Sequence, residues 1–208
     1  MNGTFIVFEG IDHSGKSTQV RLLSKKLIEK GYEVLNVREP GGTNISEKIR
    51  KIILDNKNIE MHEKTEALLF QASRAQLVNE KILPALKEGK VVIADRYIFS
   101  SLAYQGGGRL ISKDSLKSLC SFATGDLLPD FTFFTDISFE TYAQRKNWSR
   151  KNLDRIEQEN ASFFTEVRKA YLNLVNEFEN FCVVDSNGVI EKIHLEICKI
   201  LSTRLKGL

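Results

Sequence analysis

The sequence contains little cysteine, and its three cysteines lie far apart. Cys120, Cys182 and Cys198 form no C-x-x-C pair and no cluster with histidine, which argues against a zinc site. Their odd number and wide separation also give no disulfide framework. We therefore expect buried thiols in a reducing compartment.

Apolar runs long enough to span a membrane are also missing. The N-terminus lacks the basic start and the long apolar core of a signal peptide. We therefore expect a cytoplasmic protein without a membrane partner. The formal net charge is only +3, from 30 Lys and Arg residues against 27 Asp and Glu residues. This balance gives no basic surface for nucleic acid, so any useful positive charge has to be local.

Internal repeats, low-complexity tracts and linkers are absent as well, so residues 1–208 are expected to form one domain. Short β-prone stretches alternate with helical patterns along the chain. This alternation predicts an α/β fold, a five-stranded parallel sheet with helices on both faces. The predicted strands are residues 5–8, 33–37, 91–94, 131–134 and 181–184. The predicted helical regions include one from residue 16, one that Asn44 or Ser46 caps, residues 64–86 and residues 190–201.

Residues 10–17 match the phosphate-binding pattern G-x-x-x-x-G-K-[ST] in full. The pattern lies between a predicted strand and a predicted helix, which is the context that it needs. Its glycines let the backbone approach phosphate, so that N–H groups and the helix N-terminus hold the anion. Lys16 is expected to reach the β- and γ-phosphates, and the Ser17 hydroxyl to bind Mg²⁺. The residues expected to bind the nucleotide cofactor are Gly10, Ile11, Asp12, His13, Ser14, Gly15, Lys16, Ser17, Thr18 and Arg145.

Charged residues follow the ends of three other predicted strands, where ligands bind on sheets of this kind, namely Arg38, Asp95 and Asp136. Asp95 ends the third strand and Arg96 follows it directly. A carboxylate in this place binds Mg²⁺, directly or through water, or simply caps the strand. Arginine offers phosphate two parallel hydrogen bonds, although an isolated arginine is more often a solvated surface charge. The further arginines expected near this edge are Arg38, Arg50 and Arg74.

Two unusual segments follow. Residues 100–109, SSLAYQGGGR, combine hydroxyls, an amide, an aromatic ring and three consecutive glycines. These groups suit recognition of a base and a sugar, and a simple polar turn does not explain the glycines.

Residues 145–152 form a basic stretch that we expect to be a loop between helices. A charge run is usually a solvated face, but beside a phosphate-binding loop it is typical of a lid, here at about residues 145–155.

The motifs taken together resemble those of the thymidylate kinase family, and they occur in that family's order. They are FEGIDHSGKSTQ at residues 8–19, REPGGT at 38–43, DRY at 95–97, AYQGGGR at 103–109 and LDRIE at 153–157. The resemblance covers all but about the last fifty residues. It implies transfer of the γ-phosphoryl group of ATP to the 5′-phosphate of dTMP, with Mg²⁺, by a homodimer.

The same resemblance implies roles for single residues. Phe70 would stack on thymine, Arg74 would bond to its carbonyl edge, and Tyr104 would exclude a ribose 2′-hydroxyl. The residues expected to bind substrate are Arg38, Glu39, Pro40, Arg50, Phe70, Arg74, Arg96, Ser100, Tyr104, Gln105 and Glu157. The residues expected to be catalytic are Asp12, Lys16, Asp95, Arg96 and the lid arginine Arg150, with Ser17 and Asp95 as metal ligands.

Two residues depart from the family's pattern. His13 lies where some members carry a catalytic arginine and others a glycine, and we expect it to face solvent while the lid supplies the catalytic cation. Trp148 lies within the lid, where small or basic residues are commoner.

Other functions share the phosphate-binding loop. A GTPase switch needs an N-K-x-D motif, which is absent. A kinase for another pyrimidine nucleotide stays open, and so does a nucleoside kinase, because Glu39 could serve as a base toward a hydroxyl. Lys16, Ser17 and Asp95 argue against a non-catalytic nucleotide-binding module.

Overall fold

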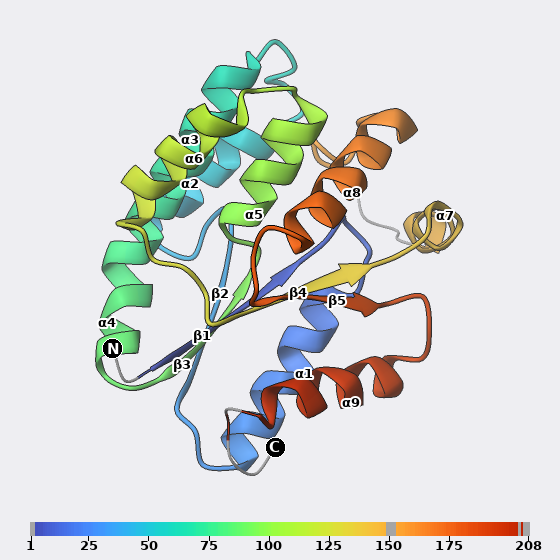
Figure 1. Ribbon diagram of the computed structural model, residues 1–208. Helices are drawn as coiled ribbons and strands as arrows, with labels where there is room; N and C mark the ends of the chain where they lie inside the picture. The colour runs from blue at the N-terminus through green and yellow to red at the C-terminus, as the bar shows by residue number, and fades with distance from the viewer. Residues whose placement is uncertain (1–2, 149–152, 204, 206–208) are drawn as a thin grey trace.

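The computed structural model describes residues 3–148, 153–203 and 205, so Arg150 lies outside the described residues. Five strands form one parallel sheet in the order β2-β3-β1-β4-β5 (Figure 1). They are β1 Thr4–Glu9, β2 Val34–Arg38, β3 Val91–Asp95, β4 Phe131–Asp136 and β5 Phe181–Asp185. The predicted five-stranded parallel sheet is confirmed, and each strand begins within a residue of its expected start.

Helices cover both faces of this sheet, as predicted. Helices α1 (Lys16–Glu29) and α9 (Ile190–Leu201) lie on one face, and α3 (Glu63–Leu77), α6 (Lys113–Thr124) and α8 (Ala161–Val175) lie on the other (Figure 1). Helix α2 (Asn44–Leu54) packs against α3. Alternate side chains of β1 enter two separate cores, because successive residues of a strand point to opposite faces. Phe5 and Val7 belong to the core under α3, whereas Ile6 and Phe8 belong to the core under α1 and α9.

The glycine run has a packing reason. Helix α5 (Ile98–Ser101) continues into the π-helix η2 (Leu102–Gly108), which lies against α8. A Cβ on Gly107 would lie 2.6 Å from the Cβ of Ala170, and a Cβ on Gly108 would collide with the ring of Phe163. The glycines therefore let α8 approach η2 closely, and this corrects the view that the whole segment serves recognition.

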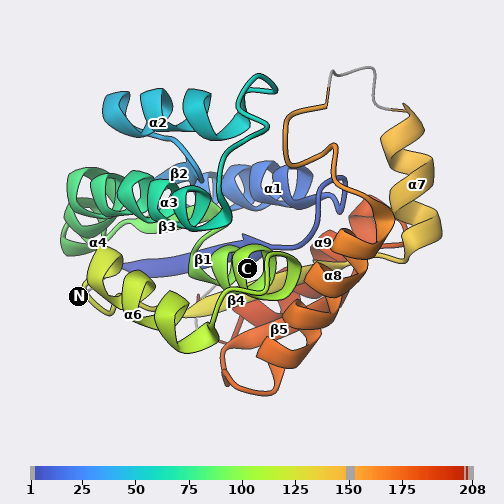
Figure 2. The same ribbon diagram turned by 90° about the horizontal axis from the view of Figure 1, so that it is seen from above.

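The basic stretch is helical rather than a loop over its described part. Helix α7 (Phe139–Trp148) includes residues 145–148, and in Figure 2 it lies at the opposite end of the molecule from α4 (Leu83–Lys87). The cap of α2 also differs from the expectation. Thr43 is the N-cap, and its Oγ1 accepts a hydrogen bond of 3.1 Å from the backbone N–H of Ser46.

The remaining long helical region is as predicted, because α3, the π-helix η1 (Val78–Ile82) and α4 follow one another without a break. Two of the three cysteines, Cys120 and Cys198, are buried, whereas Cys182 is only half-buried, and all three are free thiols. No helix among the described residues is long and apolar enough to cross a membrane.

Candidate active site

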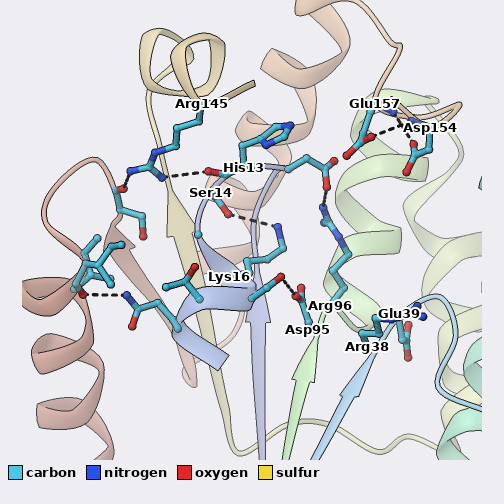
Figure 3. A pocket seen from close by; sticks show the side chains of 18 of the residues that line it. His13, Ser14, Lys16, Arg38, Glu39, Asp95, Arg96, Arg145, Asp154 and Glu157 are labelled. Atoms are coloured by element: carbon cyan, nitrogen blue, oxygen red, sulfur yellow. Dashed lines mark hydrogen bonds and ion pairs between the residues drawn. The ribbon is translucent and has the colours of Figure 1, made fainter. Parts of the chain in front are cut away.

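Two cavities adjoin each other at the carboxyl ends of the strands. The larger, of about 730 Å³, follows the phosphate-binding loop and is called the loop cavity (Figure 3). The smaller, of about 90 Å³, lies beside α3 and η2 and is called the side cavity. The two share a wall that carries two arginines and three carboxylates. Its residues are Asp12, Glu39, Arg50, Arg96 and Asp154.

The phosphate-binding loop holds its lysine inside itself. Lys16 is 6% exposed, and its Nζ donates to the carbonyl oxygens of Gly10 at 3.1 Å and Ile11 at 2.8 Å. Gly10 and Ile11 therefore position the lysine and do not line either cavity. Burial, and then the charge of Arg96, lowers the pKa of Lys16 to about 8 against the opposing effect of nearby carboxylates. Gly15 directly precedes α1 with a φ of 93°, a conformation that glycine adopts without strain.

Ser17 and Asp95 meet at the mouth of the loop cavity. The Ser17 Oγ donates to Oδ2 of Asp95 at 2.6 Å (Figure 3). The two residues come together because Asp95 ends β3 beside Phe8 of β1, while Ser17 lies in the first turn of the helix that follows β1. Oxygen ligands of this kind suit Mg²⁺, which is held by one or two carboxylates together with phosphates and water. No group of three or more His, Cys, Asp or Glu residues forms a metal cage in the part of the chain that the structure describes.

Arg96 lies on the shared wall in a fixed orientation. Its Nη2 bonds to Oδ1 of Asp12 at 2.8 Å, its Nη1 donates to the carbonyl of Gly10 at 2.8 Å, and its guanidinium lies 4.9 Å from the ring centroid of Tyr104. The residue itself has a φ of 75°, which is strained for a side chain of this size. Burial would raise the pKa of Asp12, but Arg96 and Lys16 outweigh it and lower this pKa to about 2. The aspartate is therefore ionised at any working pH.

Two other predicted arginines, Arg38 and Arg50, both line the loop cavity, and Arg50 also lines the side cavity. Arg50 and Arg38 both donate to the carbonyl of Pro40, at 2.7 and 3.0 Å. Arg38 also pairs with Glu47 at 3.0 Å on the exposed side. Burial, and then repulsion from Arg38, lowers the pKa of Arg50.

Arg74 does not reach the side cavity as expected. It is 1% exposed, and its Nη2 lies 2.6 Å from Oε2 of Glu39. Its other donors bond to Gln71, to Ser101 and to the carbonyl of Tyr97. Attraction to the buried Glu39 carboxylate explains this orientation, because the N–H groups of a buried guanidinium need hydrogen-bond acceptors. Arg74 therefore does not line the side cavity itself but holds Glu39, which does.

The side cavity is lined by the residues that the sequence proposed for a base and a sugar. Phe70 is half-buried and comes from α3, whereas Ser100, Tyr104 and Gln105 come from α5 and η2. The Ser100 Oγ donates to the buried Glu9 at 2.5 Å, so its hydroxyl is already engaged.

The lid side is built on α7. Arg145 donates to the carbonyls of His13 at 3.2 Å and Ser186 at 2.7 Å, which joins the phosphate-binding loop to the segment after β5. His13 is half-buried, and its Nε2 is enclosed without a hydrogen-bond partner among the described residues, so it does not simply face solvent. Its ring centroid lies 5.9 Å from that of Tyr142. Trp148 is 78% exposed at the end of α7.

Residues 153–159, which include the end of the predicted lid, contribute three cavity residues, and two of these are not among the expected site residues. The expected Glu157 accepts a hydrogen bond of 2.9 Å from the backbone N–H of Asp154. Asp154 lines both cavities and Ile156 lines the side cavity. Both belong to the motif LDRIE, so that motif could have indicated them.

Three residues of the C-terminal region, Ser186, Ile190 and Ile193, also line the loop cavity. Their surroundings in the sequence carry no comparable motif.

Comparison with known proteins gives a consistent result. A model of the thymidylate kinase family matches residues 8–197. Thymidylate kinase of Thermosipho africanus is 48% identical over 203 residues, which is 98% of this chain and 100% of that protein. Thymidylate kinase of Fervidobacterium nodosum is 47% identical over 97% of this chain and 100% of its own length. The crystal structure of thymidylate kinase from Ehrlichia chaffeensis superposes with a TM-score of 0.79 at 30% identity, covering 97% of this chain and 100% of that one.

Proposed function

This chain belongs to the thymidylate kinase family, and from that premise we propose how its two cavities bind the substrates of the reaction. The chain is a nucleoside monophosphate kinase that phosphorylates dTMP to dTDP, with ATP as the phosphoryl donor. The observation that carries the proposal is the wall shared by the two cavities, because two arginines lie where the donor and acceptor phosphates would meet. The loop cavity binds ATP, and the side cavity binds the thymine and deoxyribose of dTMP.

The loop cavity binds the triphosphate through the backbone of residues 12–18 and the ammonium group of Lys16. Ser17 and Asp95 offer two oxygen ligands 2.6 Å apart, which fits a Mg²⁺ ion bound with ATP. When bound, that ion neutralises charge on the β- and γ-phosphates. Arg145 reaches the same cavity from α7, so it lies within reach of the nucleotide.

The side cavity binds dTMP between the ring of Phe70 and the residues of α5 and η2. Tyr104 stands between the sugar and the shared wall, and its OH lies 3.1 Å from Arg96 Nη2 and 3.3 Å from Oδ2 of Asp12. A side chain held by two charged partners cannot turn away to admit a 2′-hydroxyl. Tyr104 therefore favours deoxyribose over ribose.

The chemistry needs positioning more than proton transfer, because the acceptor is already a phosphate anion. Arg96 and Arg50 hold the acceptor phosphate on the shared wall, and Lys16 faces the transferred group from the other side. Asp12 keeps Arg96 in place through their 2.8 Å ion pair. These fixed charges stabilise the negative charge that is spread over the transferred phosphoryl oxygens. Arg150, outside the described residues, is proposed as a further cation from the lid.

A homodimer is proposed through the outer surface of α6. Phe122 is 91% exposed there, and the nearby Leu128 is 54% exposed. Both border a hollow of about 470 Å³ that also contains Leu83. Exposed apolar groups gathered at a hollow are typical of an interaction site.

Phe122→Glu should shift the protein from dimer to monomer in size-exclusion chromatography with light scattering. Leu195→Glu, at a 64% exposed leucine of α9 on the other face, is the matched control.

A cytoplasmic location is proposed because three free thiols, one of them half-buried, are expected in a reducing compartment.

The function is tested by ADP release in a coupled assay. The acceptors compared are dTMP, dUMP, UMP, CMP, thymidine and buffer alone. We expect the highest kcat/KM with dTMP and only background release without acceptor. Preference for thymidine would contradict the proposal and favour a kinase that acts on a hydroxyl, with Glu39 as its base.

A further inference from the structure

Glu66, near the start of α3, is a buried carboxylate that lines neither cavity. It is 1% exposed, and it accepts hydrogen bonds from three side chains. Gln105 donates at 2.9 Å, Arg155 at 2.6 Å, and Arg109 at 3.2 and 3.3 Å. Burial alone would raise the pKa of Glu66, but these donors outweigh it and lower the pKa, so the group stays charged. A charge this deeply buried is retained only where its partners surround it.

The first partner, Gln105, belongs to the wall of the side cavity. A carboxylate can only accept hydrogen bonds, so the bond from Nε2 of Gln105 fixes which end of the amide points to Glu66. Glu66 therefore sets the orientation of a residue that lines the side cavity, without lining it itself.

The second partner, Arg155, belongs to residues 153–159, a segment that includes the end of the predicted lid. Its Nε donates to the carbonyl of Ile53 at 2.9 Å, and its backbone N–H donates to the carbonyl of Leu54 at 3.3 Å. The residues on either side of it in the chain, Asp154 and Ile156, both line the side cavity. The bond from Arg155 to Glu66 thus fastens the segment that carries two further cavity residues.

The third partner, Arg109, extends the network to the end of the same segment. Its Nη1 bonds to Oε1 of Glu159 at 2.6 Å, and its guanidinium lies 4.7 Å from the ring centroid of Phe163. Glu66 therefore connects three elements that enclose the side cavity: α3, η2 and residues 153–159.

We propose that Glu66 is a positioning residue for the acceptor: it holds Gln105 and residues 153–159 in the arrangement that binds dTMP. This inference rests on the proposed function of the side cavity. Since Lys16 and Ser17 lie outside this network, loss of the carboxylate weakens dTMP binding far more than ATP binding. The expected effect is the loss of about one hydrogen bond to a charged group, roughly a tenfold rise in Kd for dTMP.

The test is Glu66→Gln, which keeps the shape and removes the charge. The matched control is Asp136→Asn, because Asp136 pairs with Arg168 at 2.6 and 2.7 Å and lines neither cavity. Kd for dTMP is measured by isothermal titration calorimetry, together with KM for ATP and Tm. We expect the rise in Kd for dTMP in Glu66→Gln alone, whereas both variants lose some thermal stability.

Arg155→Met and the double variant complete a double-mutant cycle. If both residues act through one bond, the double variant binds dTMP about as weakly as the weaker single variant. Should Glu66→Gln fail to fold, Arg155→Met decides the question, because it removes the bond to Glu66 and leaves the carboxylate in place.

An unchanged Kd for dTMP in the folded variant overturns the inference, and so does an equal rise for both substrates. Failure of the wild type to phosphorylate dTMP would instead overturn the proposed function.

Discussion

Raising the pH from 7 to 9 is expected to weaken ATP binding to the free enzyme about tenfold. Lys16 has a pKa lowered to about 8 by burial and by Arg96, so it is mostly charged at pH 7 and mostly neutral at pH 9. Bound triphosphate requires the ammonium form, so the apparent Kd rises by about 1 + 10^(pH − 8), which is roughly 1.1 at pH 7 and roughly 11 at pH 9. At pH 8.5 binding should take up about 0.8 proton. The effect comes from the burial of this lysine beside Arg96.

The assay is isothermal titration calorimetry of ATP and Mg²⁺ from pH 7 to 9.5 in buffers of different ionisation enthalpy. Lys16→Arg is the control, because arginine keeps its charge throughout this range and should give a flat profile even if binding is weaker. The lowered pKa also means that the folded state binds this proton less tightly than the unfolded chain does. This group therefore favours folding more as the pH rises from about 8 toward 10.5. A flat wild-type profile without proton uptake would refute the reasoning.

Four substitutions give further predictions. Phe70→Ala should raise KM for dTMP about tenfold with little change for ATP, whereas equal losses for both substrates together with a lower Tm would mean that the ring is only part of the core. Tyr104→Ala should improve the use of ribothymidine monophosphate relative to dTMP, and an unchanged ratio of kcat/KM would place the discrimination elsewhere. Gly107→Ala should lower stability by about 1–3 kcal/mol in urea unfolding, because its Cβ would lie 2.6 Å from that of Ala170; an unchanged midpoint would contradict this. His13→Gly should keep kcat, since glycine tolerates the φ of 61° at this position; a large loss of kcat would make His13 catalytic.

The strands and the phosphate-binding loop could be predicted because their signals are local. Residues 91–94 are apolar throughout, and all four are buried in β3 between two layers of helices. Residues 10–17 contain both the turn glycines and the lysine in one continuous stretch. A prediction that depends only on residues adjacent in the sequence needs no information about the tertiary structure.

The direction of Arg74 could not be predicted for the opposite reason. Its place on α3 is compatible with a side chain that reaches the side cavity, but a distant residue decides the outcome. Glu39, the first residue after β2, lies 2.6 Å away and accepts from two of its donors. Sequence shows both charges but not their meeting, which depends on how α3 packs over the sheet.

The last part of helix α7, residues 145–148, was expected to be a loop because the residues of α7 give a weak amphipathic pattern. Tyr142 is the residue that it buries, and most of the others are polar or charged. Basic residues next to a phosphate-binding loop favour the prediction of a lid, and we expected this lid to be a loop. A helix can serve the same purpose, since Arg145 projects from α7 to the loop carbonyl of His13.

The local charge of the site also explains how a chain with a net charge of only +3 binds two polyanions. Arg38 and Arg50 converge on the same carbonyl of Pro40, and the pKa of Arg50 is lowered by burial and by this neighbour. Gathering like charges is unfavourable in the free enzyme, and phosphate relieves the repulsion when it binds. In the proposed arrangement the phosphates of the two substrates lie on either side of the shared wall, whose two arginines are Arg50 and Arg96. These arginines neutralise charge on both substrates and so reduce the repulsion between the two polyanions in the ternary complex.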